Sequence, residues 1–348
     1  MKKNLVILMI VLVAVGWWSY NQKPQEGPTG VTEAGVEENK KLDQVHPLSI
    51  ESLRNGKYEG SEIVVEEKLT DGSNYERFLT SYKSEGLKIF ALLTIPKGKA
   101  PEKGWPAIVF NHGYIPPAQY RTTEKYIAYT DGFSRNGYVL FRPDYRGHGS
   151  SEGEAEGGYG SNAYTIDVIN ALKSLEKHEA VDEENIGMWG HSMGGFITLR
   201  NMVVEKEIKA GVIWAGVVAS YTDLITNWRR PSNGAPTPTI SPAARRWRQS
   251  LIDVYGQPDE TNEFWKALSA NSYLKEISGP VQIHHGTADT SVPVEFSRKL
   301  EDQLNSAGKE VEYYEYPGDD HNLSKNFSSA MRRSVEFFDK YLKPEKVD

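Results

Sequence analysis

From residue 105 onward the chain alternates short apolar strands with stretches that can form helices, and this alternation restricts its fold more than any other feature. The expected strands are 107–110, 138–141, 186–189, 211–215, 281–284 and 311–316. Helices fit near 118–135, 161–178, 194–205, 293–307 and 325–342. Short apolar strands separated by helices are typical of a parallel sheet that is buried on both sides. We therefore expect an α/β fold, with a mostly parallel central sheet and helices on both faces.

The segments around this core have different patterns. β-rich runs at 63–69, 75–82 and 87–95 are separated by turn signals and predict an antiparallel N-terminal part of the sheet. About 65 residues separate the strands that end near 215 and begin near 281. A connection this long inside a compact domain is usually functional. We therefore expect an inserted cap at about 217–278, over the carboxyl edge of the sheet.

The first 18 residues have the pattern of a targeting segment. Lys2 and Lys3 precede eleven unbroken apolar residues, and two tryptophans follow. A cleaved signal peptide and an uncleaved membrane anchor both fit this pattern, and both predict an extracytoplasmic protein, secreted or anchored to the cell membrane. Residues 19–56 are rich in Gln, Glu, Lys, Gly and Pro, and we interpret them as a flexible tether. The folded domain is then expected at 57–348.

Composition excludes several classes of function. The 348 residues include 40 basic and 47 acidic side chains, which give a net charge of −7. This balance argues against a nucleic-acid partner, because phosphate binding needs a basic surface. The chain has no cysteine, so a thiolate nucleophile, a disulfide scaffold and a cysteine-ligated metal are all excluded.

The strongest chemical signal is the run Gly-His-Ser-Met-Gly-Gly at 190–195, between an expected strand and an expected helix. A strand that turns at once into a helix forces its central residue into a strained conformation and pushes that side chain outward. Gly190 and Gly194 stand where side chains would collide, with His191 between Gly190 and the serine. The sequence therefore predicts Ser192 as a nucleophile on a nucleophile elbow, rather than part of an ordinary glycine-rich turn.

A serine nucleophile needs a base within hydrogen-bond reach, and the base needs an acid that orients it. On an α/β sheet these groups follow later strands, in the order Ser, Asp, His. Asp289 and His321 each come directly after an expected strand, at the edge where such sheets build their sites. We predict Asp289 as the acid and His321 as the base.

Other titratable residues near these two are alternatives for the same roles. Asp319 and Asp320 compete with Asp289, although they adjoin the histidine in sequence, which usually places a carboxylate wrongly for the ring Nδ1. His284 and His285 lie so close to a strand end that we expect them to pack or to bond locally.

Acyl transfer also needs donors directed at the oxyanion. The N–H of Met193, the residue after the nucleophile, is one expected donor. The second is expected in the loop after the strand 107–110, where the N–H of Tyr114 is our candidate. The alternative is that His112-Gly113 forms only a tight turn.

The glycine-rich loop at 142–151 is interpreted as structural support for the oxyanion side, with Asp144 and Arg146 paired. It does not match the phosphate-binding pattern G-x-x-x-x-G-K-[ST]. The chain also lacks the metal-binding pattern H-E-x-x-H. We therefore expect neither a metal nor a cofactor.

Six ordered motifs together resemble the α/β-hydrolase superfamily, and within it the prolyl oligopeptidase-like and dienelactone-hydrolase-like serine hydrolases. They are the run at 82–96, His-Gly at 112–113, Pro-Asp-Tyr-Arg-Gly-His-Gly at 143–149, the elbow at 190–195, His-Gly-Thr-Ala-Asp-Thr-Ser-Val-Pro at 285–293 and Asp-His at 320–321. The resemblance covers about 75–342. It implies an α/β-hydrolase fold in which Ser192, Asp289 and His321 form a triad that cleaves an acyl bond.

The chain departs from these relatives in ways that bear on the substrate. Prolyl oligopeptidases proper carry a large N-terminal β-propeller, whereas about a hundred residues precede the core here. Tyr114 replaces the second glycine of a common His-Gly-Gly motif, and Ser192 stands where dienelactone hydrolases have cysteine. The resemblance implies hydrolysis of a short peptide or a small carboxylic ester through an acyl-enzyme. An acyltransferase and a catalytically silent binding module are the alternatives.

The expected cap contains five arginines and no carboxylate between Leu224 and Ile252. We hypothesise that this basic patch attracts an acidic or carboxylate-bearing substrate, with Arg229, Trp228 and Trp247 as candidate substrate contacts. The alternative is a solvated helix face whose arginines stack on these tryptophans.

Overall fold

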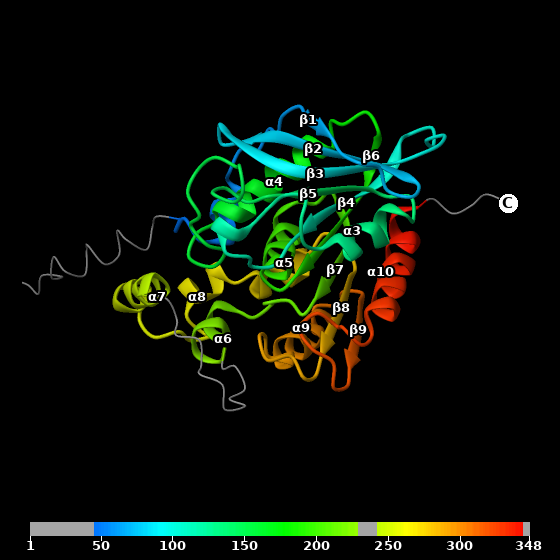
Figure 1. Cartoon of the computed structure of the whole chain (residues 1–348). Coiled ribbons are helices and arrows are strands. Elements are labelled where there is room, and N and C mark those ends of the chain that lie inside the picture. The colour runs from blue at the N-terminus through cyan, green and yellow to red at the C-terminus, as the bar shows by residue number, and fades with distance from the viewer. Residues whose placement is uncertain (1–44, 229–241, 344–348) are drawn as a thin grey trace, which may run out of the picture. The chain divides into compact units, whose positions relative to one another are not determined.

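The computed structural model describes residues 45–228 and 242–343, and within them nine strands form one sheet (Figure 1). The order across the sheet is β1-β2-β3-β5-β4-β6-β7-β8-β9. The strands are β1 Val64–Lys68, β2 Tyr75–Ser84, β3 Leu87–Pro96, β4 Trp105–Asn111, β5 Val139–Pro143, β6 Val181–His191, β7 Ile208–Trp214, β8 Val281–Gly286 and β9 Val311–Tyr316. Each of them overlaps a strand that the sequence predicted.

The sheet changes direction at β5. Strands β1, β2, β3 and β5 pair antiparallel, and every pairing from β5 through β4, β6, β7 and β8 to β9 is parallel. The predicted antiparallel N-terminal part and the predicted parallel core are therefore both confirmed. All parallel strands end at the same edge, and the predicted catalytic residues follow three of them.

Helices cover both faces of the sheet (Figure 1). The α-helices outside the cap are α2 Ile50–Arg54, α3 Ile127–Ser134, α4 Ala163–Leu175, α5 Met193–Val204, α9 Val294–Ser306 and α10 Phe327–Leu342. Helices α2, α4, α5 and α9 pack on one face, and α3 and α10 pack on the other. Each face therefore has its own buried apolar cluster, which explains why the central strands are continuous apolar runs.

The cap lies between β7 and β8 in the chain. Its described part contains α6 Tyr221–Thr226, α7 Pro242–Tyr255, α8 Glu263–Leu268 and the 3₁₀ helix η2 Ala270–Glu276. A further 3₁₀ helix, η1 Pro117–Gln119, precedes α3. Residues 229–241 of the predicted cap lie outside the described residues. The targeting segment at 1–18 and the first part of the predicted tether lie outside them as well.

The predicted tether extended to residue 56, and the structure differs there. Ser49 caps the N-terminus of α2, since its hydroxyl accepts a hydrogen bond from the Ser52 N–H at 3.0 Å. Arg54 Nη2 donates to the Val203 carbonyl at 2.6 Å, and Leu53 is buried. Polar composition suggested a segment without structure, but a few apolar residues and one cap are enough to dock it on α5.

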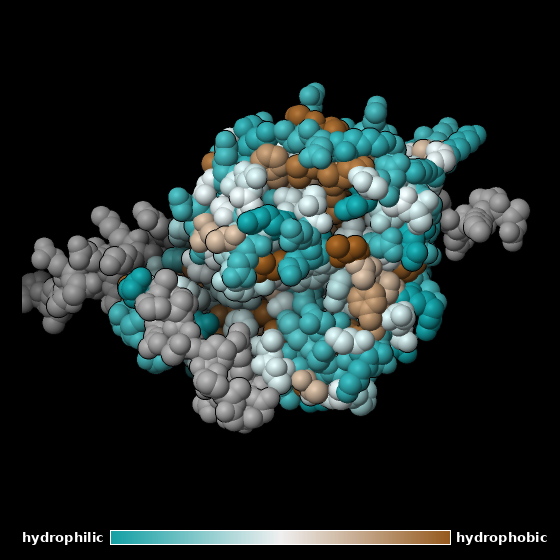
Figure 2. All heavy atoms as spheres, in the orientation of Figure 1, coloured by the Kyte–Doolittle hydropathy of each residue, from teal (hydrophilic) through white to brown (hydrophobic). Residues whose placement is uncertain are grey.

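Strand β1 forms the edge of the sheet that is farthest from β9. Its residues Val64 and Val65 are 53% and 54% exposed, and Figure 2 shows hydrophobic side chains gathered over the β1–β3 end of the viewed face. Across residues 45–228 and 242–343, no helix has both the length and the apolar character needed to cross a bilayer.

Candidate active site

Ser192 lies between the last residue of β6 and the first residue of α5, with φ 57° and ψ −119°. Few residues other than glycine adopt this conformation, so the serine is strained as the elbow prediction requires. Two close approaches explain the flanking glycines. A Cβ on Gly190 would lie 2.3 Å from the Gly194 carbonyl oxygen, and a Cβ on Gly194 would lie 1.9 Å from that of Asn111. The sharp turn therefore depends on these two positions.

Asp289 and His321 lie together although 32 residues separate them in the chain. His321 Nδ1 donates to Asp289 Oδ2 at 2.6 Å. The Asp289 side chain is fully buried, whereas that of His321 keeps 19% exposure, so only the imidazole is open to a ligand. Asp319 and Asp320 do not reach this ring, because their carboxylates accept hydrogen bonds from backbone N–H groups of their own loop.

The loops that carry Asp289 and His321 are bonded to each other. The Ala288 N–H donates to the Asp319 carbonyl at 2.9 Å, and the Gly318 N–H donates to Thr287 Oγ1 at 2.8 Å. A Cβ on Gly286 would lie 2.4 Å from the Asp319 carbonyl oxygen, so the two loops also approach closely. These contacts fix the acid relative to the imidazole.

A second histidine also holds Asp289. His285 Nε2 donates to Asp289 Oδ2 at 3.1 Å, and Ser297 Oγ donates to His285 Nδ1 at 2.7 Å. The other carboxylate oxygen accepts from the backbone N–H of Val292 at 3.0 Å. Burial alone would raise the pKa of Asp289, but the hydrogen bonds from His285 and His321 outweigh burial and lower its pKa well below the usual range. The carboxylate therefore stays ionised.

His321 also lies beside the elbow. Its ring centre is 4.7 Å from that of His191, the residue before Ser192. In the part of the chain that the structure describes, no hydrogen bond joins the Ser192 hydroxyl to the His321 imidazole. Such bonds are often longer in enzymes without substrate. The structure thus joins Asp289 to His321 directly and places the His321 loop against His191, the residue before Ser192.

The loop after β4 lies against the nucleophile. A Cβ on Gly113 would be 3.1 Å from the Ser192 Cβ, and the Gly113 N–H is already used, since it donates to Tyr126 Oη at 2.9 Å. The N–H groups of Met193 and Tyr114, the two predicted oxyanion donors, donate to no acceptor among the described residues. Both are therefore available to a ligand.

The predicted pairing of Asp144 with Arg146 is wrong. Arg146 Nη2 bonds Asp167 at 2.7 Å and Glu85 at 2.8 Å, while Asp144 accepts from Thr122 Oγ1 at 2.8 Å. The chain leaves β5 at this point and turns, so the two side chains diverge. Burial raises the pKa of Asp144 to about 7, although its hydrogen bonds act in the opposite direction.

Trp228 lies close to the acid loop. Its Nε1 donates to the Ser291 carbonyl at 3.0 Å, and its ring centre is 5.5 Å from that of Tyr159. The Tyr159 ring in turn lies 5.1 Å from that of Phe196 on α5. An aromatic wall of Tyr159, Phe196 and Trp228 therefore stands beside the elbow helix. Arg229 lies outside the described residues.

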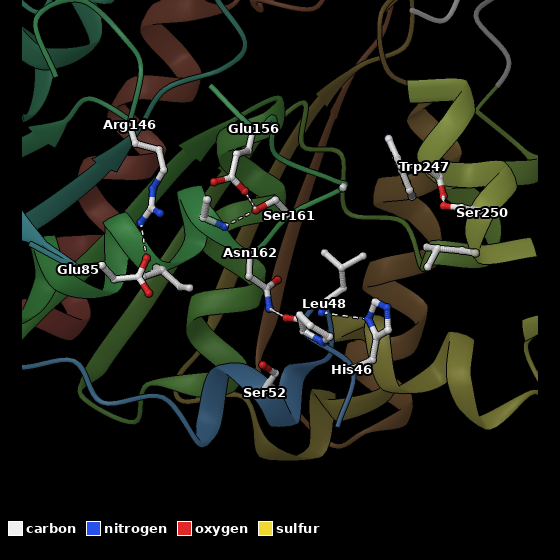
Figure 3. A pocket seen from close by; sticks show the side chains of 15 residues that line it. His46, Leu48, Ser52, Glu85, Arg146, Glu156, Ser161, Asn162, Trp247 and Ser250 are labelled. Atoms are coloured by element: carbon white, nitrogen blue, oxygen red, sulfur yellow. Dashed lines mark hydrogen bonds and ion pairs between the residues drawn. The ribbon is translucent and has the colours of Figure 1, made fainter. Parts of the chain in front are cut away.

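Trp247 lies on α7, and the contacts found for it among the described residues include none of the three predicted catalytic residues. It packs on Gly160, where a Cβ would lie 3.1 Å from its ring, and it lines a pocket of about 590 Å³. Figure 3 shows this pocket between Trp247 and Ser250 on one side and Arg146 with Glu85 on the other. The fifteen side chains that line it do not include a predicted catalytic residue. The described residues contain no cluster of His, Asp and Glu that could hold a metal ion.

The sequence did not indicate three further contacts of the site. These are Tyr126 with His191, His191 with the His321 backbone, and His285 with Asp289. Strand ends located the predicted catalytic residues, but no spacing in the chain marks Tyr126, which precedes α3. The signal for His285 was its place four residues before Asp289.

The strand order, the elbow after β6 and the bonded loops after β8 and β9 define an α/β-hydrolase. Residues 125–345, more than half of the chain, match the prolyl oligopeptidase family. The chain therefore belongs to the prolyl oligopeptidase family and is a serine hydrolase. This finding confirms the resemblance that its six motifs indicated.

Two Bacillus subtilis proteins are similar over most of their length. The protein named uncharacterized peptidase YtmA is 25% identical over 73% of this chain and 90% of its own length. The protein named putative esterase YitV is 25% identical over 72% of this chain and 94% of its own length. Peptidase and esterase names therefore both occur among the relatives.

A similar solved structure is the acylaminoacyl peptidase of Pyrococcus horikoshii, with a TM-score of 0.60 and 25% identity. The match covers 79% of this chain, which spans only 44% of the length of that peptidase. The likeness therefore concerns one part of a longer protein.

Proposed function

We propose that this protein hydrolyses acyl bonds of small carboxylic esters or short peptides through a covalent acyl-enzyme. His321 Nε2 takes the proton of the Ser192 hydroxyl as the oxygen attacks the substrate carbonyl. The N–H groups of Met193 and Tyr114 stabilise the oxyanion. His321 then gives the proton to the leaving group, and a water that it deprotonates cleaves the acyl-enzyme.

The observation that carries this proposal is the 2.6 Å hydrogen bond from His321 Nδ1 to the buried carboxylate of Asp289. It leaves the other ring nitrogen free to accept a proton, and the ionised carboxylate stabilises the imidazolium that forms. The strained backbone of Ser192, beside the helix terminus of α5, supports its role as the nucleophile.

We further propose that the acyl group carries a negative charge that Arg248 binds. The Arg248 guanidinium carbon lies 5.5 Å from the centre of the Trp247 ring, and its Nε is buried without a partner. Within the described ranges no carboxylate perturbs the pKa of Arg248, which burial lowers. The loop that contains Gly158 packs against the residue after Ser192, because a Cβ on Gly158 would lie 2.8 Å from Met193 Sδ. Its neighbour Tyr159 interacts electrostatically with Arg248.

Replacing the nucleophile tests the proposed reaction. Ser192→Ala should lower kcat for p-nitrophenyl acetate and for an aminoacyl anilide by at least ~10³-fold. Labelling by a fluorophosphonate probe should disappear with the activity. Ser328→Ala, on the exposed face of α10, is the matched control and should keep both. A Ser192→Ala variant with a nearly normal rate would refute the proposal, and transfer to an added alcohol faster than to water would indicate an acyltransferase.

A further inference from the structure

Four groups from distant parts of the chain form a continuous series of hydrogen bonds behind the candidate catalytic residues. The Gly113 N–H bonds Tyr126 Oη at 2.9 Å, and Tyr126 Oη bonds His191 Nδ1 at 2.8 Å. His191 Nε2 bonds the His321 carbonyl at 3.0 Å. The series therefore begins in the oxyanion loop, passes through the elbow and ends on the backbone of the candidate base.

The two ends of this series determine the direction of every bond. A backbone N–H can only donate, so Tyr126 Oη accepts from Gly113 and gives its one proton to His191 Nδ1. His191 is then the Nε2–H tautomer, which donates to the His321 carbonyl. Burial lowers the pKa of His191 to about 3, so the ring stays neutral and keeps both bonds at neutral pH.

Tyr126 is held in place at a cost in backbone strain. Its φ is 49° and its ψ is 21°, and Lys125 before it also has a positive φ of 55°. The buried side chain of Arg142 clamps this turn: its Nη1 donates to the Lys125 carbonyl at 2.8 Å, and its Nη2 donates to the carbonyl of Thr122. Strain of this kind persists only where surrounding contacts over-determine the conformation, and it clusters at functional sites.

We propose that Tyr126 and His191 are positioning residues that hold the oxyanion loop and the catalytic histidine in register with Ser192. Both act through other groups, since Tyr126 bonds the Gly113 N–H of the oxyanion loop and His191 bonds the His321 carbonyl. Gly113 precedes the candidate donor Tyr114, so its bond to Tyr126 sets where that N–H points. The hydrogen bond from His191 fixes the position of the His321 backbone relative to the elbow. This inference rests on the proposed acyl transfer, because the register matters only if Ser192, His321 and the oxyanion donors act together.

Tyr126→Phe tests the series with little change in packing, because the ring keeps its contacts with Phe110 and Tyr129. We expect kcat to fall by about 10- to 100-fold with KM within about 2-fold, since misplacement of catalytic groups by about 1 Å can cost up to about 100-fold. Affinity for a boronic acid transition-state analogue should fall by the same factor as kcat. Tyr138→Phe is the matched control, because it removes another buried tyrosine hydroxyl, bonded to Asp339 at 2.6 Å, far from the elbow.

A second measurement does not depend on activity. In Tyr126→Phe the Gly113 amide loses its acceptor, so hydrogen exchange of the peptide around 111–116 should accelerate at least about 10-fold, and exchange around 319–324 should accelerate too. His191→Gln, which retains a donor for the His321 carbonyl, should keep more activity than His191→Phe.

Each outcome bears on a different claim. Unchanged exchange in a folded Tyr126→Phe variant, or a loss of kcat no greater than in Tyr138→Phe, would overturn the positioning role. Accelerated exchange in an enzyme whose hydrolysis does not depend on Ser192 would instead overturn the proposed function and leave the hydrogen-bonded series in place.

Discussion

Two buried histidines, His191 and His284, form hydrogen bonds through both ring nitrogens. Tyr316 Oη bonds His284 Nδ1 at 2.8 Å, and Gln282 Oε1 bonds His284 Nε2 at 2.6 Å. Burial, helped by the nearby positive charge of Arg333, lowers the pKa of His284 to about 3. His191 has a similarly lowered pKa. At pH values well above 3, both imidazoles therefore take up a proton only when the protein unfolds.

The lowered pKa of His284 predicts how the free energy of unfolding changes with pH. The unfolded chain binds a proton at His284 below pH 6.5, whereas the native state does so only near pH 3, so the free energy of unfolding falls as pH drops through this window. His284→Gln should reduce that slope by one proton, about 1.4 kcal/mol per pH unit between pH 4 and 6. Urea titrations at several pH values measure it. Parallel pH profiles for the two proteins would contradict the prediction.

At the residue scale, the sequence predicted those candidate catalytic positions that are marked by a short local pattern, such as the end of a strand or a strand–turn–helix motif. Asp289 and His321 follow strands, and Ser192 lies in a strand–turn–helix motif, so strand order alone indicated the three positions. The bond between Tyr126 and His191 joins residues that are 65 positions apart, and only the packing of α3 against the sheet brings them together. The failed pairing of Asp144 with Arg146 has the same origin, because tertiary partners outcompeted a sequence neighbour.

At the element scale, one buried arginine joins three segments. Arg200 of α5 donates to the Leu268 carbonyl at 2.7 Å, to the Leu48 carbonyl at 2.8 Å and to Asn162 Oδ1 at 2.6 Å. Its guanidinium carbon lies 5.3 Å from the centre of the Phe196 ring. The N-terminal segment, the end of α8 and the start of α4 are therefore fastened to the helix that follows the nucleophile.

Removing this guanidinium should destabilise the domain. Arg200→Met leaves two buried carbonyls and one amide oxygen without a donor, and we expect the free energy of unfolding to fall by about 2–4 kcal/mol. Arg332→Met is the matched control: Arg332 is exposed and pairs with Glu336, so its loss should cost under about 0.5 kcal/mol. Urea unfolding followed by circular dichroism measures both. Limited proteolysis should also cut Arg200→Met earlier between residues 45 and 56, and equal stability of the two variants would contradict the prediction.

Elements with strong periodicity were predicted well, because a strand buried on both sides or an amphipathic helix is visible in a short window of sequence. The short helix α2 was missed because its five residues carry no such period. Its position depends on Arg54 and on Arg200, which lies 146 residues further along. Composition did not reveal a docking contact made by so few residues.

At the scale of the whole molecule, charge is unevenly distributed. The chain has a net charge of −7, which repels anions in general, yet the cap carries arginines without a carboxylate from Leu224 to Ile252. Burial lowers the pKa of Arg248, and a half-buried cation without a carboxylate partner gains most from a ligand that supplies one. A cap of this kind is expected to select substrates by charge, while the aromatic wall beside α5 accommodates their apolar part.

Arg248→Gln tests this selection. With p-nitrophenyl hemisuccinate, kcat/KM should fall about 10-fold, the size expected for one lost hydrogen-bonded charge, while with neutral p-nitrophenyl butyrate it should stay within about 2-fold. Arg246→Gln, two residues earlier on α7 and exposed, is the matched control and should leave the ratio between the two esters unchanged. Added salt should weaken the preference of the wild-type protein for the anionic ester but not that of Arg248→Gln. An ester ratio that is the same in wild type and Arg248→Gln would mean that the arginine only stacks on Trp247, and the substrate would then be selected by shape alone.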